Sequence, residues 1–346
     1  MPVQLVTPLA DAFLSERLYD DLELWAPRLT RRTLPAKHWV PRTRPDQLTA
    51  WITEFVTSVE AGRTEVTAPG RHADRFGGQL VLVTGAGNGI GRATVLAFAE
   101  AGARVVAVDL DAEAAARTAE EARSAGASAA WARTVDVSDA QAMEKLAEEI
   151  TAEHGVVDVL VNNAGVGLGG SFFDTTPENW KRVLDVNLWG VIHGCRLFGA
   201  RMAGRGQGGH IVNVASAAAY QPSRALTAYS TSKAAVLMLS ECLRAELAGQ
   251  GIGVTAVCPG IVNTGITSSA RFAGADTEEE QHRRRRAVRP YRLRNYPPEK
   301  VAAAILRAVV RDEAVVPVTP ESRGAYVLAR WMPGVLRRIA RVKPLV

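Results

Sequence analysis

A tyrosine and a lysine lie one helical turn apart in the segment YSTSK, as Tyr229 and Lys233. Residues four positions apart lie on the same face of a helix, so their side chains can act together. A free tyrosine has a pKa of about 10 and is a poor base at neutral pH. A neighbouring ammonium group stabilises the phenolate and lowers this pKa. The pair is therefore suited to the proton transfer that accompanies conversion between an alcohol and a carbonyl.

Two further polar residues precede this pair. Ser216 lies 13 residues before Tyr229, at the end of the apolar run HIVNV, and Asn187 lies in the segment DVNLWGVIHG. A serine hydroxyl can hold the substrate oxygen beside a tyrosine, and an asparagine side chain can hold a water for proton relay. A Tyr–Lys pair alone would also occur on a solvated helix surface. The catalytic interpretation therefore depends on the nucleotide-binding features that accompany it.

A glycine-rich segment, TGAGNGIG, occupies residues 84–91 between an apolar run and an amphipathic segment. Glycines allow the backbone to approach a pyrophosphate closely, and a helix N-terminus favours its negative charge. The pattern G-x-G-x-x-G fails in register because residue 90 is isoleucine, and the pattern present is T-G-x-x-x-G-x-G. A tight strand–helix turn would look similar. The strand before it and the helix after it favour a dinucleotide loop.

Asp109 ends the second apolar run, 18 residues after Gly91. A carboxylate at this point can accept hydrogen bonds from both ribose hydroxyls of NAD and would repel the 2′-phosphate of NADP. Asn88 and Leu110, where a basic residue could hold that phosphate, are uncharged. A helix-capping or surface aspartate is the alternative. We expect NAD, rather than NADP, as the cofactor.

The elements that must position these residues follow a repeated strand–turn–helix pattern from residue 79 onward. The apolar runs are continuous in Val, Ile and Leu instead of alternating, which is typical of parallel strands buried on both faces. Alternation with helices predicts a doubly wound α/β fold, in which ligands bind at the carboxyl ends of the strands. The predicted strands lie within residues 79–85, 103–109, 131–137, 157–165, 209–216 and 251–260.

These motifs together resemble the short-chain dehydrogenase/reductase family over about residues 78–265, which implies a single Rossmann-type domain. Asn187, Ser216, Tyr229 and Lys233 coincide with the four catalytic positions of the family, and Asp109 with its NAD-selecting acid. Ala215 departs from the commonest pattern, in which a first serine precedes the catalytic one. The cofactor-binding positions implied by the resemblance are Gly85, Asn88, Gly89, Ile90, Asp109, Asp136, Val137, Asn163, Ala164, Gly165, Tyr229, Lys233, Pro259, Gly260, Val262 and Thr264.

The resemblance implies hydride transfer between nicotinamide and a carbon bearing a hydroxyl or carbonyl group. Tyr229 would be the acid/base, Ser216 would orient the substrate oxygen, and Lys233 would lower the tyrosine pKa and bind the nicotinamide ribose. Asn187 would carry the proton relay through water. Members of the family often form dimers or tetramers through two long helices, which correspond here to about residues 178–203 and 227–250. We expect a secondary alcohol or ketone, hydrophobic in character, as the substrate.

Residues 1–61 read as strand–Asp–helix–strand–His–helix, with Asp11 and His38 at the ends of the two strands. That order resembles the C-terminal part of an α/β-hydrolase, and HWVPRTRPDQLTAWI resembles the epoxide-hydrolase branch. The segment contains no nucleophile, so it cannot perform hydrolase chemistry alone. The chain then resembles part of an actinobacterial hydrolase–dehydrogenase fusion with a linker at residues 62–77. An unrelated extension that packs on the main domain, 78–297, is the alternative.

The net charge of +5 is concentrated at the C-terminus, because residues 281–346 carry 16 basic and 4 acidic side chains. Residues 265–297 correspond to the family's substrate loop and contain EEEQHRRRR, which a solvated charged helix would explain. Residues 298–346 are expected to form a helix and a basic amphipathic tail. Such a tail can lie on an anionic membrane surface, which would suit a lipid-like substrate, or pack on the body.

The remaining composition excludes other classes of protein. There is no run of eighteen apolar residues and no secretory signal pattern, so we expect a cytoplasmic protein, peripheral to a membrane if the tail binds one. The three cysteines lie far apart and form no CxxC pair, which argues against a disulfide scaffold and a metal site. Aromatic residues are not organised around the basic run, so nucleic acid is not expected as a partner. The competing functions are a non-catalytic nucleotide-binding scaffold and the reductase half of a bifunctional hydrolase–dehydrogenase. A hydrolase acting alone is rejected, because the segment has no nucleophile.

Overall fold

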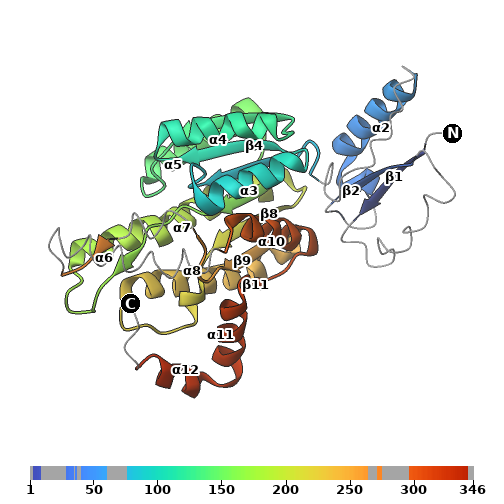
Figure 1. Cartoon of the computed structure of the whole chain (residues 1–346). Helices are drawn as coiled ribbons and strands as arrows, with labels where there is room; N and C mark the ends of the chain where they lie inside the picture. Colours follow the sequence, from blue (N-terminus) through green and yellow to red (C-terminus); the bar gives the residue numbers. More distant parts are fainter. Residues whose placement is uncertain are drawn as a thin grey trace.

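The computed structural model describes residues 3–8, 29–34, 36, 40–60, 76–263, 271–274 and 296–341. Its body is a parallel sheet of seven strands in the order β11-β9-β8-β6-β3-β4-β5 (Figure 1). The strands are β3 (Leu80–Thr84), β4 (Arg104–Asp109), β5 (Ala129–Thr134), β6 (Val159–Asn162), β8 (Gly209–Val214), β9 (Ile252–Cys258) and β11 (Val315–Pro317). This sheet confirms the doubly wound fold expected from the sequence.

Helices cover both faces of the sheet, which explains why its strands are apolar on both sides. One core lies under α3 (Gly89–Glu100), α4 (Ala112–Ser124) and α10 (Pro298–Arg311). The other core lies under α5 (Ala140–His154), α7 (Gly190–Arg205) and α8 (Thr227–Leu247). All five residues of β3 are buried between the two layers. A strand between two helical layers must therefore be apolar along its whole length.

The strand order reverses at β3, which places a crevice at its carboxyl end. β4 lies on one side of β3 and β6 on the other, and all three strands are parallel. The connections that leave the carboxyl ends of β3 and β6 therefore diverge to opposite faces, and ligands of such sheets bind in the resulting crevice. The glycine-rich loop and the segment NNAG follow these two strands directly.

Several elements differ from the sequence expectation. The strand expected within residues 131–137 is β5, which begins two residues earlier and ends at Thr134. Strand β11 was not predicted, because only three residues, ending in Pro317, pair with β9 at the sheet edge. The helix expected over 178–203 is instead α6 (Pro177–Leu184), a π-helical turn (Asp185–Trp189) and then α7. Such single π-helical turns are frequent at functional sites.

The N-terminal unit, which we define as residues 3–8, 29–34, 36 and 40–60, forms a small structure of its own beside the body (Figure 1). β1 (Val3–Pro8) pairs in parallel with β2 (Leu29–Leu34), and α1 (Val40–Thr43) leads into α2 (Pro45–Glu60). Its buried apolar residues are Leu34, Ala36, Val40 and Trp51. Asp11 and His38, the expected helix at 15–26 and most of the expected linker lie outside the described residues.

The elements that follow β9 also belong to the body. A two-residue strand, β10 (Arg271–Phe272), pairs with β7 (Leu168–Gly169), while the rest of the expected substrate loop lies largely outside the described residues. The expected C-terminal helix is α10, and the tail forms α11 (Pro320–Trp331) and α12 (Pro333–Ile339). In the described part of the chain, no helix is both long and apolar enough to span a membrane.

Candidate active site

The glycine-rich loop is folded so tightly that three of its glycines cannot carry a side chain. A Cβ on Gly91 would lie 2.0 Å from the carbonyl oxygen of Gly85, and a Cβ on Gly85 would lie 2.8 Å from Cα of Ala164. Gly85 also has φ of +65°, which disfavours other residues. The loop therefore presents bare backbone at the N-terminus of α3, a cradle suited to a pyrophosphate group.

Asp109 closes the same loop from the end of β4. Its Oδ2 accepts a hydrogen bond from the backbone N–H of Gly87 at 2.7 Å, and its Oδ1 accepts one from Asp111 at 3.0 Å. Each carboxylate oxygen has a further lone pair, so both can still accept from ribose hydroxyls. A Cβ on Gly87 would lie 2.9 Å from Oδ2 of Asp109, which explains the glycine beside the acid.

Asn163 and Thr84 tie the ends of β3 and β6 together across the crevice. The side-chain amide of Asn163 donates to the carbonyl oxygens of Thr84 and Gly85 at 2.9 and 3.0 Å. The hydroxyl of Thr84 accepts from the backbone N–H groups of Asn163 and Ala164 at 3.0 and 3.1 Å. Asn163 and Ala164 thus shape the cofactor loop from behind. The role of Thr84 was missed, although its position directly before the first glycine was a usable signal.

The expected adenine pair, Asp136 and Val137, lies just beyond the carboxyl end of β5. Oδ1 of Asp136 accepts from both the backbone and the hydroxyl of Ser138, at 2.9 and 2.7 Å. Val137 is buried, and its carbonyl oxygen lies 3.1 Å from Nδ1 of His193 on α7. Both residues are therefore held at the edge of the sheet where Asp109 also lies.

Lys233 is buried below the crevice, with only 3% of its surface exposed. Its Nζ donates to the carbonyl oxygen of Val214 at 2.8 Å and lies 6.0 Å from the centre of the Tyr229 ring. Burial lowers the pKa of Lys233 from 10.5 to about 8. The ammonium is thus held close to the tyrosine in a place where its charge is costly, which is typical of functional lysines.

Asn187 lies in the π-helical turn, fully buried, and holds the loop after NNAG. Its Oδ1 accepts from the backbone N–H of Val166 at 2.7 Å, and its Nδ2 donates to Val166 O at 3.0 Å and to Ser232 Oγ at 3.2 Å. A Cβ on Gly165 would lie 3.3 Å from Oδ1 of Asn187 and 3.5 Å from Nζ of Lys233. The side chain therefore has one lone pair of Oδ1 left for a water.

Ser216 and Tyr229 are less buried than Lys233 and Asn187, since both are only half-buried. Ser216 follows β8 at its carboxyl end, where its Oγ accepts from the backbone N–H of Ala218 at 3.2 Å. That bond leaves the hydroxyl proton available for another oxygen. Tyr229 lies in the first turn of α8, one turn before Lys233. The structure thus places all four expected catalytic residues around the carboxyl ends of β6 and β8.

The segment after β9 packs between this site and the C-terminal helix α11. The carbonyl oxygen of Pro259 accepts from Ala217 at 2.8 Å, and a Cβ on Gly260 would lie 2.3 Å from Oγ1 of Thr319. Val262 is buried. Thr264 lies outside the described residues.

Two contacts of α11 were not expected from the sequence. Tyr220, four residues after Ser216, donates to the carbonyl oxygen of Ser322 at 3.0 Å, and the hydroxyl of Ser322 donates to the carbonyl oxygen of Cys258 at 2.6 Å.

Asn88, Gly89 and Ile90 begin α3, with Asn88 exposed at the N-cap and Ile90 packed against the core. Among the described residues there is no group of three or more His, Cys, Asp or Glu side chains that could hold a metal ion.

Comparison with known proteins agrees with this geometry. The short chain dehydrogenase family matches residues 79–273. "Probable oxidoreductase EphD" of Mycobacterium tuberculosis is 45% identical over 99% of this chain and 59% of its own length. The chain thus spans about three fifths of this relative. D-threitol dehydrogenase of Mycolicibacterium smegmatis is 40% identical over 57% of this chain and 75% of its own.

Solved structures show the same fold. A short chain dehydrogenase/reductase from Burkholderia phymatum, crystallised in complex with NAD, has a TM-score of 0.70 and 31% identity, over 78% of this chain and 99% of its own. A short chain dehydrogenase from Mycobacterium paratuberculosis, bound to NAD, has a TM-score of 0.63 and 26% identity, over 72% of this chain and 99% of its own. The glycine cradle, the buried lysine and these similarities lead to one conclusion: the chain belongs to the short chain dehydrogenase family of oxidoreductases.

Proposed function

We propose that this protein is an NAD-dependent oxidoreductase that interconverts a secondary alcohol and a ketone. The observation that carries the proposal is the buried ammonium of Lys233 beside the Tyr229 ring. When bound, the nicotinamide supplies or accepts the hydride. The ammonium stabilises the phenolate of Tyr229, which takes the hydroxyl proton on oxidation and returns it on reduction. The hydroxyl of Ser216 donates to the substrate oxygen and orients it.

NAD is preferred over NADP in this proposal because of Asp109. Its two oxygens lie at the end of β4, already aligned by Gly87 and Asp111. A 2′-phosphate at this position would face a carboxylate at close range, which costs binding free energy. The structures in complex with NAD are consistent with this choice.

The test is a titration of the purified chain with NADH and with NADPH, followed by quenching of tryptophan fluorescence. We expect NADH to bind more tightly. Oxidation of a panel of hydrophobic secondary alcohols and of polyols with NAD then defines the substrate class. Tyr229→Phe should abolish turnover and keep NADH binding. Turnover that survives this substitution would contradict the mechanism, and a chain that binds NADH but turns over none of the panel would favour a nucleotide-binding scaffold.

We also propose that α11 and α12 contact an anionic membrane surface. Ser322, Ala325 and Leu336 are buried against the protein, whereas Trp331 is 82% exposed. The exposed surface of the tail combines large apolar side chains (Val327, Trp331, Met332 and Ile339) with arginines (Arg323, Arg330, Arg337, Arg338 and Arg341). Such a combination favours the interface of an anionic bilayer. A membrane-bound enzyme would have access to lipid-like alcohols.

Co-sedimentation with vesicles tests the membrane proposal. We expect binding to vesicles of phosphatidylglycerol and phosphatidylcholine, weaker binding to phosphatidylcholine alone, and loss of binding in Trp331→Ala. Phe173→Ala is the matched control, because Phe173 is also an exposed aromatic side chain but lies outside the tail. No pelleting of the wild-type protein would exclude the proposal.

The N-terminal unit supports a further proposal, that it is the C-terminal part of an α/β-hydrolase-like domain. Its two strands are parallel and are followed by the amphipathic α2, as at the end of such a sheet. Two strands alone are marginal as a sheet, so further strands would complete it.

We also propose that the protein forms a homo-oligomer through its long helices. Trp189, directly before α7, and Met238, on α8, are both exposed apolar side chains. Sedimentation analysis tests the oligomer.

A further inference from the structure

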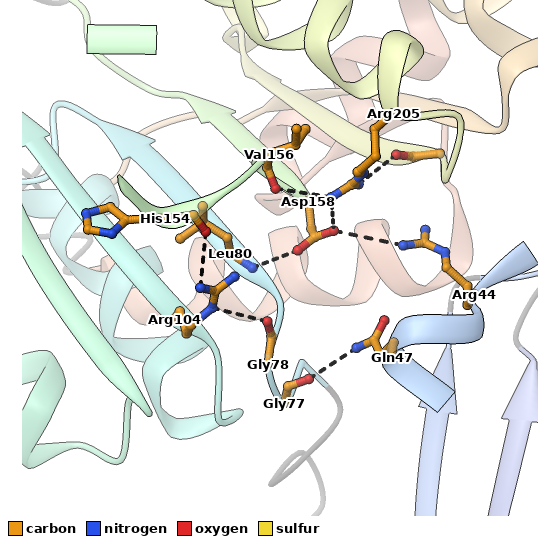
Figure 2. Close-up of polar contacts among 11 residues, drawn as sticks. Arg44, Gln47, Gly77, Gly78, Leu80, Arg104, His154, Val156, Asp158 and Arg205 are labelled. Carbon is orange, nitrogen blue, oxygen red and sulfur yellow. Dashed lines mark hydrogen bonds and ion pairs between the residues drawn. The ribbon is translucent and has the colours of Figure 1, made fainter. Parts of the chain in front are cut away.

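A partly buried ion cluster joins the N-terminal unit to the body, at the edge of the sheet opposite the redox site (Figure 2). Its centre is Asp158, which lies directly before β6. Oδ2 of Asp158 accepts from the backbone N–H of Leu80 at 2.8 Å, and its Oδ1 lies 2.8 Å from Nη1 of Arg205. The same Oδ1 lies 3.9 Å from Nη1 of Arg44, which belongs to the N-terminal unit.

The position of this cluster is fixed by the strand ends. Leu80 begins β3, Asp158 precedes β6, and Gly209 begins β8, so the cluster lies at the amino edge of the sheet. The glycine-rich loop, Asp109, Ser216 and Lys233 all gather at the carboxyl edge or the helices beside it. The N-terminal unit therefore contacts the body on the side away from the cofactor cradle.

Arg44 lies beside a small cavity at the junction of the N-terminal unit and the body. Its side chain lines this cavity together with Gln79, Asp158, Val159, Gly209, His210 and Val309. The side chain of Arg44 is only 7% exposed, although it lies at the junction of two helices on a small unit. His210, which lines the same cavity, is kept neutral because burial lowers its pKa. The charges that act on Arg44 are the carboxylate of Asp158, which attracts it, and the guanidinium of Arg205, which repels it.

The other contacts of the cluster hold the receiving surface in place. Arg205 donates to the carbonyl oxygens of Val156 and Gly208 at 3.1 and 3.0 Å, so Asp158 is aligned before Arg44 arrives. Gln47, one turn further along the N-terminal unit, donates to Gly77 O at 3.4 Å. Figure 2 shows both side chains pointing from the N-terminal unit toward the body. A buried arginine with an aligned carboxylate partner is the usual form of an anchor at an interface.

We propose that the amino edge of the dehydrogenase sheet is a docking site for the N-terminal unit, with Arg44 as its anchor. Docking at this edge fixes the position of the unit while the redox site at the opposite edge works independently of it.

The test compares Arg44→Met with Arg42→Met in the full chain. Arg42 is the matched control, because it lies two residues before Arg44, in α1, and is exposed. Hydrogen–deuterium exchange of residues 45–60 is the first readout, and the affinity for NADH is the second. We expect exchange in α2 to rise about tenfold or more in Arg44→Met, as loss of a buried charged contact predicts, and to stay at the wild-type rate in Arg42→Met. NADH affinity should stay within about twofold in both variants.

A double substitution tests the named partner. Asp158→Asn keeps an oxygen that can accept from Leu80 but removes the charge, so adding Arg44→Met to it should change exchange less than in the wild-type background. Unchanged exchange in Arg44→Met, or fully additive effects, would overturn the docking assignment. A folded Arg44→Met with clearly altered NADH affinity would overturn the independence of the two edges. If Arg44→Met does not fold, Arg44→Lys, which loses the planar fork, takes its place. The exchange readout needs no cofactor, so it decides the docking even if NADH does not bind.

Discussion

Lys233 is the residue at which folding and chemistry oppose each other. Its ammonium is buried beside a single carbonyl oxygen, and burial lowers its pKa to about 8. A shift of this size corresponds to about 3 kcal/mol against the charged form. Proteins keep such destabilising groups where activity needs them. We therefore expect the lysine to serve the proposed site and not the stability of the fold.

Lys233→Met should separate the two roles. We expect turnover to fall by about a hundredfold or more, because the phenolate of Tyr229 loses its neighbouring charge. The free energy of unfolding of the cofactor-free protein at pH 7 should stay the same or rise, because the buried charge is removed. Urea denaturation and steady-state kinetics on the same preparation measure both. A strongly destabilised variant would contradict this account of the lysine.

The same lysine predicts a pH dependence. The unfolded chain holds its proton up to about pH 10.5 and the folded chain only to about 8, so between these values the unfolded state binds more protons. The contribution of Lys233 to stability therefore rises with pH over this window. Buried Cys195 and Cys258, whose pKa burial raises to about 12, act in the opposite direction above pH 9. The difference between wild type and Lys233→Met, measured by urea denaturation from pH 7 to 10, isolates the lysine and should shift in favour of wild type as pH rises.

The charge of Asp109 should control the preference for NADH over NADPH. Asp109→Asn keeps an oxygen for the N–H of Gly87 but removes the charge that would repel a 2′-phosphate. We expect the ratio of the NADPH and NADH dissociation constants to fall about tenfold. This corresponds to about 1.4 kcal/mol of binding free energy. Fluorescence titration with the two nucleotides measures the ratio. An unchanged ratio would show that another part of the loop selects the cofactor.

At the scale of elements, the π-helical turn before α7 is what delivers Asn187 to the loop after β6. Asn187→Ala would leave the buried N–H and C=O groups of Val166 without their present partner. We expect a loss of about 1–3 kcal/mol in the free energy of unfolding, together with reduced turnover. Asn187→Asp, which buries a carboxyl group at a fully buried position and turns an oxygen toward the carbonyl oxygen of Val166, should be destabilised at least as much. Equal stability of wild type and Asn187→Ala would contradict the positioning role.

The sequence predicted most of the elements that carry the site, because each has a strong local signal. Buried Val-rich strands and the glycines after β3 require particular residues at particular positions, and so they can be recognised one segment at a time. The π-helical turn and β11 could not be predicted in this way. The turn depends on how Asn187 contacts Val166 and Ser232, and β11 depends on an edge supplied by β9. Tyr220 was missed for the same reason, since its partner lies 102 residues away. Thr84 was missed although its place directly before the first glycine was a local signal.

At the scale of the whole molecule, His210 links acidity to stability. It is buried at the amino edge, its Nε2 lies 2.8 Å from Oγ1 of Thr255, and burial lowers its pKa despite the nearby carboxylate of Asp312. The unfolded chain therefore binds a proton at a higher pH than the folded chain. This contribution to stability is present above about pH 6.5, the ordinary histidine value, and is lost as the pH falls. Arg244, which pairs with Asp312, acts in the same direction.

His210→Gln tests this link, because glutamine can still bond to Thr255 but does not titrate. Urea denaturation at pH 7 and pH 5 should show a smaller loss of stability for this variant than for wild type. The same loss in both proteins would assign the acid sensitivity to other groups.

The order of strands also bears on how the chain is made. β3, at the centre of the sheet, and the cofactor loop after it are synthesised before α10, which packs on α3, and before β11, which lies at the edge of the sheet. Parallel pairings join segments distant in sequence, and such topologies fold slowly. The nascent chain must therefore keep its apolar strands from aggregating until residue 317 has emerged. The cradle for the cofactor is therefore synthesised well before the helix and the strand that complete the fold around it.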